Sequence, residues 1–495
     1  MTVDRVKVGI GSYFSRIVST SPVRIAFVAS VLLSIIAILG VATIGRDAAL
    51  YLDIASKVAE GGPGVAWAFD WPWFILLLAG THVVLHLPLE WCAYLWCTLF
   101  MAGTCALLVD CVRQRVPEAA GWACLVVLAM PAINQFRNDI IREYGFWFFC
   151  CLALWLVLRW QARGGWLRAG YVHVAIVAAM LFRLEAVMLF AAFGLWQLTG
   201  LRRRENWSRF VQFAALPLVG LVVGGGVLAV HGGVSSTRLD YFMGMLDPQR
   251  IFSSFSQLSQ QFGDSLAQKY SRDDAGLIIA FGMAATLLLK FVSLAGPFSL
   301  PFLQRYTWRS VAVWLREFQP FVWAGLVYLV ILMLFFITQQ FMISRYMSFL
   351  NVLVVPLLAV GAMLFARRFP RMGKALLVLG LLVMLSNVIS TGARKTHYVE
   401  AGHWIAEHID AKAPVYYEDG RISYYAGRGY PLLLPRELAL APQQIVQFRY
   451  FALEERADAP WLATWLETNQ LRVLASFQNR KKATVLVIGP AGSAE

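Results

Sequence analysis

Long apolar runs separated by short polar segments occupy most of this chain, up to about residue 392. The first run, residues 25–44, is unbroken and long enough to cross a bilayer as a helix. The composition agrees, because 59% of the residues are hydrophobic and only 15% are charged, against about a quarter in soluble domains. The pattern predicts an α-helical polytopic membrane protein.

Basic residues cluster in the short segments between the apolar runs, as they do in cytoplasmic loops. The formal net charge of +14 therefore indicates orientation and not a nucleic-acid partner. The N-terminus is predicted to be cytoplasmic, and the first span is expected to be uncleaved because no small-residue cleavage site stands out. The predicted outer loops are residues 45–90, 137–143, 232–274 and 338–346.

Two segments decide how often the chain crosses the membrane. We expect residues 71–88 to form a helix along the outer surface, and residues 171–200 to form two short spans that turn at Arg183-Leu184-Glu185. This interpretation gives about eleven spans and places the C-terminus in the periplasm. The alternative is that 71–88 crosses the membrane and 171–200 is a single long span.

The tail, residues 395–495, carries charges throughout and is predicted to be a small periplasmic α/β domain that follows a transmembrane domain over 1–394. The strand-like runs are 413–417, 422–425 and 483–488, and the helical segments are 398–409 and 458–469.

No cofactor is predicted from the sequence. The seven cysteines lie in or beside apolar runs, with no disulfide framework and no spacing that suits a metal. His82 and His86 are spaced to share a metal, but they lack a third ligand and are better explained as interfacial histidines. A divalent metal stays open.

Three predicted outer segments and one short turn bring acidic and basic side chains to one face of the membrane. They contribute Asp47, Asp53 and Asp70; Arg137, Asp139, Arg142 and Glu143; Arg345 and Tyr346; and Arg183 with Glu185. Guanidinium groups suit a lipid phosphate, and a carboxylate can take the proton of an attacking hydroxyl. These residues suit group transfer from a lipid-phosphate donor. The long loop 232–274 is expected to close over the site that they form.

Most of these residues also have ordinary structural explanations. These are helix capping for Asp47, a solvated helix position for Asp53, a turn for Asp70, an interfacial ion pair for Arg142 with Glu143, and reach to the membrane boundary for Arg345.

Several motifs then occur in the order of a known family. Asp47 is followed by Tyr51 and Asp53-Ile54-Ala55, and Asp70 stands before the predicted surface helix. Glu143 precedes Phe148-Phe149, and Arg345-Tyr346 begins a span that contains Pro356. Over residues 25–366 the chain resembles the GT-C superfamily of polyprenyl-phosphate-sugar-dependent glycosyltransferases, especially family 39, which includes bacterial lipid A aminoarabinose transferases and protein O-mannosyltransferases.

The chain departs from the pattern of this family at three places. One proline is missing after Asp70, Glu143 stands where aspartate is usual, and Ala48 follows Asp47 where some members have glutamate. The first two departures leave the type of acceptor open, and the third weakens the analogy to members that use a paired acidic motif.

The resemblance implies an inverting glycosyltransferase of a bacterial inner membrane. It would move a sugar from a polyprenyl-phosphate carrier to an acceptor hydroxyl at the periplasmic face. The implied roles are base for Asp47; positioning of acceptor or sugar for Asp70, Glu143, Asp139 and Tyr51; and binding of the donor phosphate for Arg345, Arg142, Arg183 and Tyr346. The partners are the lipid-linked donor, membrane lipids, and a lipid, glycan or protein acceptor.

Three alternatives stay open: a transporter or flippase of lipid-linked sugars, a ligase of whole glycans, and a non-catalytic scaffold. Transport is less favoured, because the predicted spans carry few charges and no internal repeat is visible. The sequence does not specify the sugar.

Overall fold

The computed structural model describes residues 21–202, 204–230, 244–389 and 394–491. The start of the predicted outer loop 232–274 lies outside the described residues. Contacts between Cα atoms divide the chain into two compact units, which are described separately. Unit 1 comprises residues 1–35, 96–137 and 142–388, and unit 2 comprises residues 36–95, 138–141 and 389–495.

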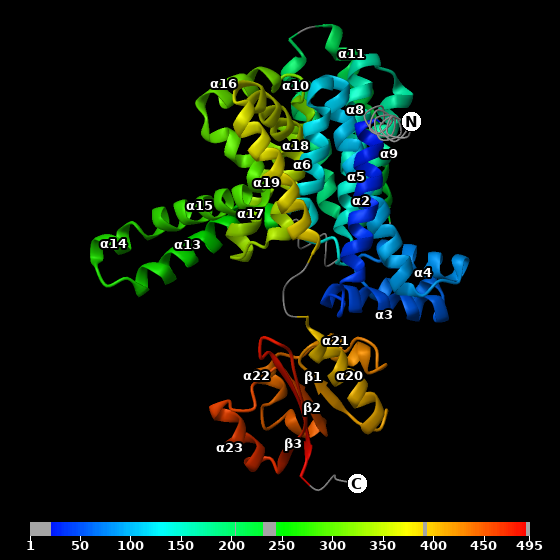
Figure 1. Cartoon of the computed structure of the whole chain (residues 1–495), viewed down its shortest axis with the longest axis vertical. Helices are drawn as coiled ribbons and strands as arrows, with labels where there is room; N and C mark the ends of the chain where they lie inside the picture. Colours follow the sequence, from blue (N-terminus) through cyan, green and yellow to red (C-terminus); the bar gives the residue numbers. More distant parts are fainter. Residues whose placement is uncertain (1–20, 203, 231–243, 390–393, 492–495) are drawn as a thin grey trace, which may run out of the picture. The chain divides into compact units, whose positions relative to one another are not determined.

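Unit 1 is helical throughout its described part (Figure 1). Two helices are shared between the units, α2 (Pro22–Leu39) and α5 (Leu89–Arg115). The helices wholly within unit 1 are α6 (Ala120–Ala129), α7 (Pro131–Asn134), α8 (Glu143–Arg163), α9 (Trp166–Phe182), α10 (Met188–Gly200), α11 (Glu205–Val230), α13 (Pro248–Ser265), α14 (Lys269–Asp273), α15 (Ala275–Ala295), α16 (Arg305–Trp314), α17 (Gln319–Gln339), α18 (Ser344–Arg368) and α19 (Pro370–Val388), with 3-10 turns η2 (Pro117–Ala119), η3 (Leu184–Val187) and η4 (Gly296–Leu303).

Within the described residues, eight helices are long and apolar enough to cross a membrane, fewer than the eleven spans expected. The difference has a structural reason, because three expected spans form shorter apolar helices, at Pro117–Ala129, Trp166–Phe182 and Leu184–Gly200. The chain is therefore a helical membrane protein. The segment expected to lie on the surface forms α4 (Trp73–Leu85), which is also too short to be counted among the eight.

The segment 171–200 breaks at Arg183, as the two-helix interpretation requires. Helix α9 ends at Phe182, Arg183 has extended backbone angles (φ −147°, ψ 124°), and η3 leads into α10. A single straight helix across this segment is excluded.

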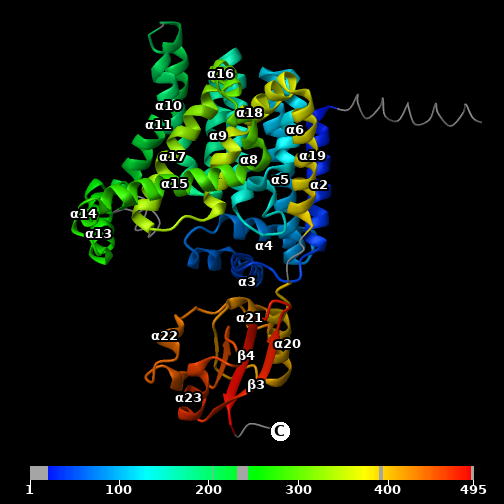
Figure 2. The same cartoon turned by 60° about the vertical axis from the view of Figure 1, so that its left-hand side comes forward.

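Helix α18 forms the centre of unit 1. It packs against α6, α15, α16, α17 and α19, and most of its residues are buried. Around it, α13 and α15 run side by side and are joined at one end by α14, to one side of the other helices of unit 1 in both views (Figures 1 and 2). The predicted outer loop therefore contains helices, α13 and α14, within its described part.

Unit 2 combines an N-terminal helical segment with the α/β tail. The N-terminal segment contains α3 (Arg46–Gly61), η1 (Pro63–Ala68) and α4. The tail contains α20 (Thr396–His408), β1 (Val415–Tyr417), α21 (Gly420–Tyr425), α22 (Arg436–Ala439), η5 (Ile445–Gln447), β2 (Tyr450–Leu453), α23 (Pro460–Thr468), β3 (Leu471–Gln478) and β4 (Thr484–Pro490).

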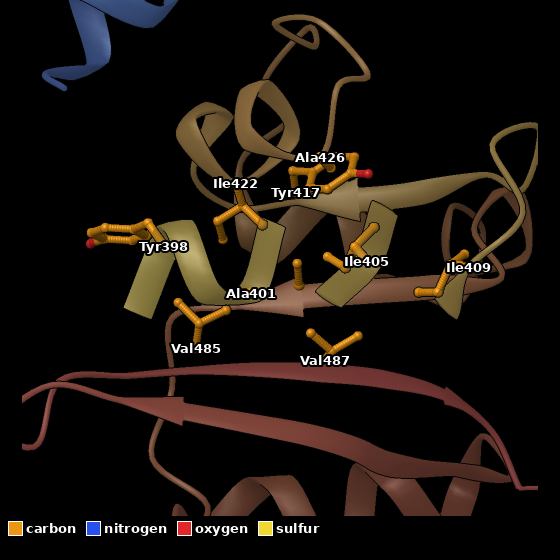
Figure 3. Close-up of a cluster of buried hydrophobic side chains, with 10 residues drawn as sticks. Tyr398, Ala401, Ile405, Ile409, Tyr417, Ile422, Ala426, Val485 and Val487 are labelled. Carbon is orange, nitrogen blue, oxygen red and sulfur yellow. The ribbon is translucent and has the colours of Figure 1, made fainter. Parts of the chain in front are cut away.

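The sheet of the tail has strand order β1-β2-β4-β3, with β1 and β2 parallel and the other pairs antiparallel. Alternate residues of β4 face opposite sides, because side chains alternate along a strand. Val485 and Val487 belong to the hydrophobic cluster formed with α20 (Figure 3). Leu486 and Ile488 belong to the cluster on the other face. Each face of the sheet thus has its own hydrophobic core.

The expected strand over 422–425 is wrong, since these residues belong to helix α21. The Asp419 side chain accepts a hydrogen bond from the backbone N–H of Arg421 and caps this helix. The cap outweighs the strand propensity of Tyr424 and Tyr425. Strands β2 and β3 were not anticipated from the sequence.

Candidate functional site

A cluster of buried charges in unit 1 is centred on Glu143, the first residue of α8. The Glu143 side chain is only 5% exposed. Arg183 Nη1 donates a hydrogen bond of 2.8 Å to Glu143 Oε1, and Arg345 Nε lies 3.1 Å from the same oxygen. Three separate elements therefore meet here: the start of α8, the break between α9 and η3, and the first turn of α18.

Arg183 links this carboxylate to a second one. Its Nε donates to Glu185 Oε1 at 3.1 Å, and its Nη2 contacts the same oxygen. Its guanidinium also lies 4.9 Å from the centre of the Tyr346 ring, a cation–π contact. The extended backbone at Arg183 allows this side chain to leave the helical path and reach both carboxylates.

Arg142 adds a third cation to the cluster. Its positive charge attracts the Glu185 carboxylate. Its Nη1 is buried without a hydrogen-bond partner. Three guanidinium groups, those of Arg142, Arg183 and Arg345, thus gather around the carboxylates of Glu143 and Glu185. Guanidinium groups suit a bound anion, and phosphate oxygens match guanidinium geometry.

Two ordinary explanations given for these residues are wrong. Glu143 pairs with Arg183 and Arg345, so the pairing is not a local one between Arg142 and Glu143. Arg345 lies within reach of a buried carboxylate, so its role is not merely to extend to the membrane boundary.

An apolar cavity of about 450 Å³ lies between α15, α17 and α18. Its walls are aliphatic and aromatic side chains, among them Leu287, Leu329 and Leu353. On α18 the lining begins at Leu350, about 7.5 Å along the helix axis from Arg345. Helix α18, which supplies Arg345 to the charge cluster, therefore also supplies one wall of the apolar cavity.

Arg137 lies outside the charge cluster although it was predicted to belong with Arg142 and Glu143. It is 3% exposed, and its Nη1 donates hydrogen bonds of 2.9 Å to the carbonyl and hydroxyl oxygens of Ser30 and to Ser34 Oγ. Its Nε donates to Asn134 Oδ1 at 2.8 Å. Arg137 therefore anchors α2 to α7.

The other predicted acids, Asp47, Asp70 and Asp139, lie in unit 2. Asp47 is in the first turn of α3, but the N-cap residue is Gly45, so N-capping does not explain Asp47. Tyr51 is buried and meets the rings of Phe69 and Phe74 edge-on at 6.1 and 5.6 Å, which joins α3 to the segment that follows it. Asp70 is exposed in the turn before α4.

Asp53 is buried, contrary to the expectation of a solvated position. Its side chain is 8% exposed, and Lys57 Nζ donates to its Oδ2 at 2.6 Å, one helical turn along α3. The pair neutralises the carboxylate within unit 2 and gives Asp53 a structural role.

A network in unit 2 was missed by sequence reasoning. Arg46, directly before Asp47, donates from Nε to Asp419 Oδ2 at 2.6 Å and from Nη2 to Glu454 Oε1 at 3.3 Å. Asp419 is fully buried and also accepts hydrogen bonds of 2.8 and 2.6 Å from the Arg421 guanidinium. The only sequence signal is the run Asp419-Gly420-Arg421, which does not indicate its distant partner.

Further hydrogen bonds join the same two segments of unit 2. Tyr425 Oη accepts from the Ile44 backbone N–H at 3.0 Å, and Tyr424 Oη donates to Glu90 at 3.1 Å. The N-terminus of α3, which carries Asp47, is thus fastened to the α/β tail.

The ion network shifts the acidity of its carboxyl groups. Burial alone raises the pKa of Asp419, but hydrogen bonds and charge from Arg421, with a further hydrogen bond from Arg46, outweigh it and hold the pKa well below the ordinary 3.8. Burial and the charge of Asp419 raise the pKa of the Glu454 carboxyl. Asp419 therefore stays ionised at neutral pH.

Replacing Asp419 with asparagine is expected to lower the free energy of unfolding by about 3–5 kcal/mol at pH 7, because buried Arg421 then lacks its counter-charge. A carboxyl group whose pKa is lower in the folded state stabilises the fold at any pH above its pKa in the unfolded chain. This contribution is lost as the pH falls through the pKa of the group in the folded state. The difference in the free energy of unfolding between the parent protein and Asp419→Asn should therefore narrow below about pH 4.

The raised pKa of Glu454 has the opposite effect on stability. As the pH falls, Glu454 is protonated before Asp419, and the loss of its charge relieves the repulsion between the two carboxylates. Unfolding of the full chain in detergent, followed from pH 7 to pH 3, measures the difference. Asp458→Asn, in an exposed ion pair with Arg456, is the control and should cost under about 0.5 kcal/mol. A constant difference down to pH 3 would contradict the assignment.

The described residues contain no group of three or more histidine, cysteine or acidic side chains that could hold a metal ion. His82 Nδ1 lies 2.6 Å from the Leu87 carbonyl oxygen, and His86 ends α4 in the left-handed conformation (φ 55°). Both histidines therefore have roles at the end of a helix.

Comparison with known proteins finds no family model that matches this chain and no significant match among curated proteins.

Proposed function

We propose that this chain is an inverting glycosyltransferase of the GT-C type in a bacterial inner membrane. It transfers a sugar from a polyprenyl-phosphate carrier to an acceptor hydroxyl at the periplasmic face. The observation that carries the proposal is the cluster of three arginines and two glutamates. Its cation Arg345 lies in the first turn of α18, and the same helix lines an apolar cavity.

The cluster supports a role in holding the phosphate of the donor. Its guanidinium groups match the geometry and the negative charge of a phosphodiester. Arg183 and Arg345 are fixed by Glu143 and are held in place before the ligand arrives, so little rotamer entropy is lost on binding. The apolar cavity suits part of the polyprenyl chain, because its lining on α18 begins at Leu350, shortly after the turn that carries Arg345.

The proposed reaction is a single displacement. The oxygen of the acceptor hydroxyl attacks the anomeric carbon of the sugar, and the bond between that carbon and the phosphate oxygen breaks. The polyprenyl phosphate leaves with the bonding electron pair, and the cationic cluster stabilises its growing charge. The proton of the hydroxyl passes to the carboxylate of Asp47, the role that the family resemblance gives it.

The remaining predicted residues receive supporting roles in this proposal. Glu143 orients the two arginines that surround it. Tyr346 stacks beneath Arg183 and keeps its guanidinium in place, while Tyr328 Oη donates to the Tyr346 carbonyl at 2.9 Å. Asp70 and Asp139 are assigned to the acceptor or the sugar.

Transfer of radiolabel from the donor tests the function. Purified full chain in proteoliposomes is given a panel of polyprenyl-phosphate pentoses and hexoses together with fractions of the bacterial envelope. We expect label in one acceptor fraction, with release of an equal amount of polyprenyl phosphate. Label that crosses the bilayer while still on its carrier would identify a transporter, and en bloc transfer of a polymer would identify a glycan ligase.

A further inference from the structure

A second cavity in unit 1 lies at the far end of α8 from the charge cluster. Its volume is about 410 Å³, and it is bounded by the last turns of α8 and α10 and the first turns of α11 and α17. Trp160 and Glu143 lie on the same helix about 25 Å apart, close to the thickness of a bilayer core. The cavity is thus separate from the cluster assigned to the donor phosphate.

The lining of this cavity is rich in hydrogen-bond donors. Arg202 and Arg209 contribute two guanidinium groups, and the described lining contains no carboxylate. Trp196 Nε1 donates to Gln319 Oε1 at 2.7 Å, which leaves the amide N–H groups of Gln319 to donate. Arg115 Nη2 donates to Gln161 Oε1 at 2.8 Å in the same way.

Trp160 provides a second, independent observation. Its ring is completely buried beside the cavity, and its indole N–H has no hydrogen-bond partner. A buried donor without an acceptor is unfavourable by about 1–3 kcal/mol, so an acceptor atom brought in by a ligand is favoured here. Two cations, two amides and an indole N–H together select an anion with several oxygen atoms.

We infer that this cavity binds the phosphate head group of an anionic phospholipid. The neighbouring surface is suited to lipid tails, because Leu198 on α10 is 49% exposed and Trp207 on α11 is 52% exposed. Tryptophan is enriched at the level of lipid head groups, and basic pockets between membrane helices bind anionic lipids. The basic segments of the chain gather around this end of α8, including Arg159 and Arg163. The inference does not depend on the proposed transferase reaction.

Native mass spectrometry of the full chain tests the inference. The protein in detergent is titrated with phosphatidylglycerol, with phosphatidylcholine and with glycerol phosphate. We expect one tightly held phosphatidylglycerol and no comparable binding of the other two. The double variant Arg202→Gln/Arg209→Gln should bind phosphatidylglycerol on the order of tenfold more weakly.

Two further variants keep the result decisive. Arg309→Gln removes an exposed arginine that does not line the cavity and should bind phosphatidylglycerol as the parent does. Arg202→Lys/Arg209→Lys keeps both charges and should retain most of the binding, which separates loss of charge from loss of fold. Equal binding by the glutamine variant would overturn the site, and equal binding of glycerol phosphate would overturn its assignment to a lipid.

Discussion

Replacing Asp47 with asparagine is expected to lower the rate of sugar transfer by about 10²–10⁴-fold, because an amide cannot take the proton of the attacking hydroxyl. The change is nearly isosteric, and Asp47 lies in the first turn of a helix that is held by Arg46 and by the Tyr51 aromatic contacts. The fold should therefore persist. Initial rates in proteoliposomes, measured at saturating donor, give the loss in kcat.

Glu60→Gln is the matched control for this prediction, since it removes another carboxylate from α3 at an exposed position. It should leave the rate unchanged. Full transfer by Asp47→Asn would remove Asp47 from the mechanism, whatever its effect on stability.

The features that the sequence predicted well are those with a local signal. Apolar runs gave the long helices, and the charged pair Arg183 and Glu185 inside an apolar stretch indicated the break between α9 and α10. Glu143, Arg183 and Arg345 were named from the residues and their order, and the structure brings these three side chains together.

The features that escaped prediction depend on distant contacts. Arg46 and Asp419 are 373 residues apart, and no periodicity or spacing joins them. The burial of Asp53 has a similar origin, because Asp53 lies against Gly429 of the tail. At residues 422–425 the local signal existed but was misleading, since tyrosines favour strands while the capping carboxylate of Asp419 determines a helix. Tertiary context therefore decided each of these cases.

Replacing Glu143 with glutamine is expected to reduce stability by about 3–5 kcal/mol and to abolish transfer. The substitution leaves Arg183 and Arg345 close together in a buried cluster without the carboxylate that both contact. Their mutual repulsion would displace the guanidinium groups that are proposed to hold the donor phosphate. Thermal unfolding in detergent and the initial rate of sugar transfer from the lipid-linked donor measure the two effects.

Glu143→Asp separates charge from shape at this position. It keeps the negative charge but shortens the side chain by one methylene, and it introduces the residue that is usual in the resembling family. Because the counter-charge remains, we expect most of the stability to return, with a raised KM for the donor where the arginines are held less well. Glu118→Gln breaks an exposed ion pair with Arg367 and should cost under about 1 kcal/mol. If Glu143→Gln proved as mild as Glu118→Gln, the buried cluster would not be the anchor for the donor phosphate.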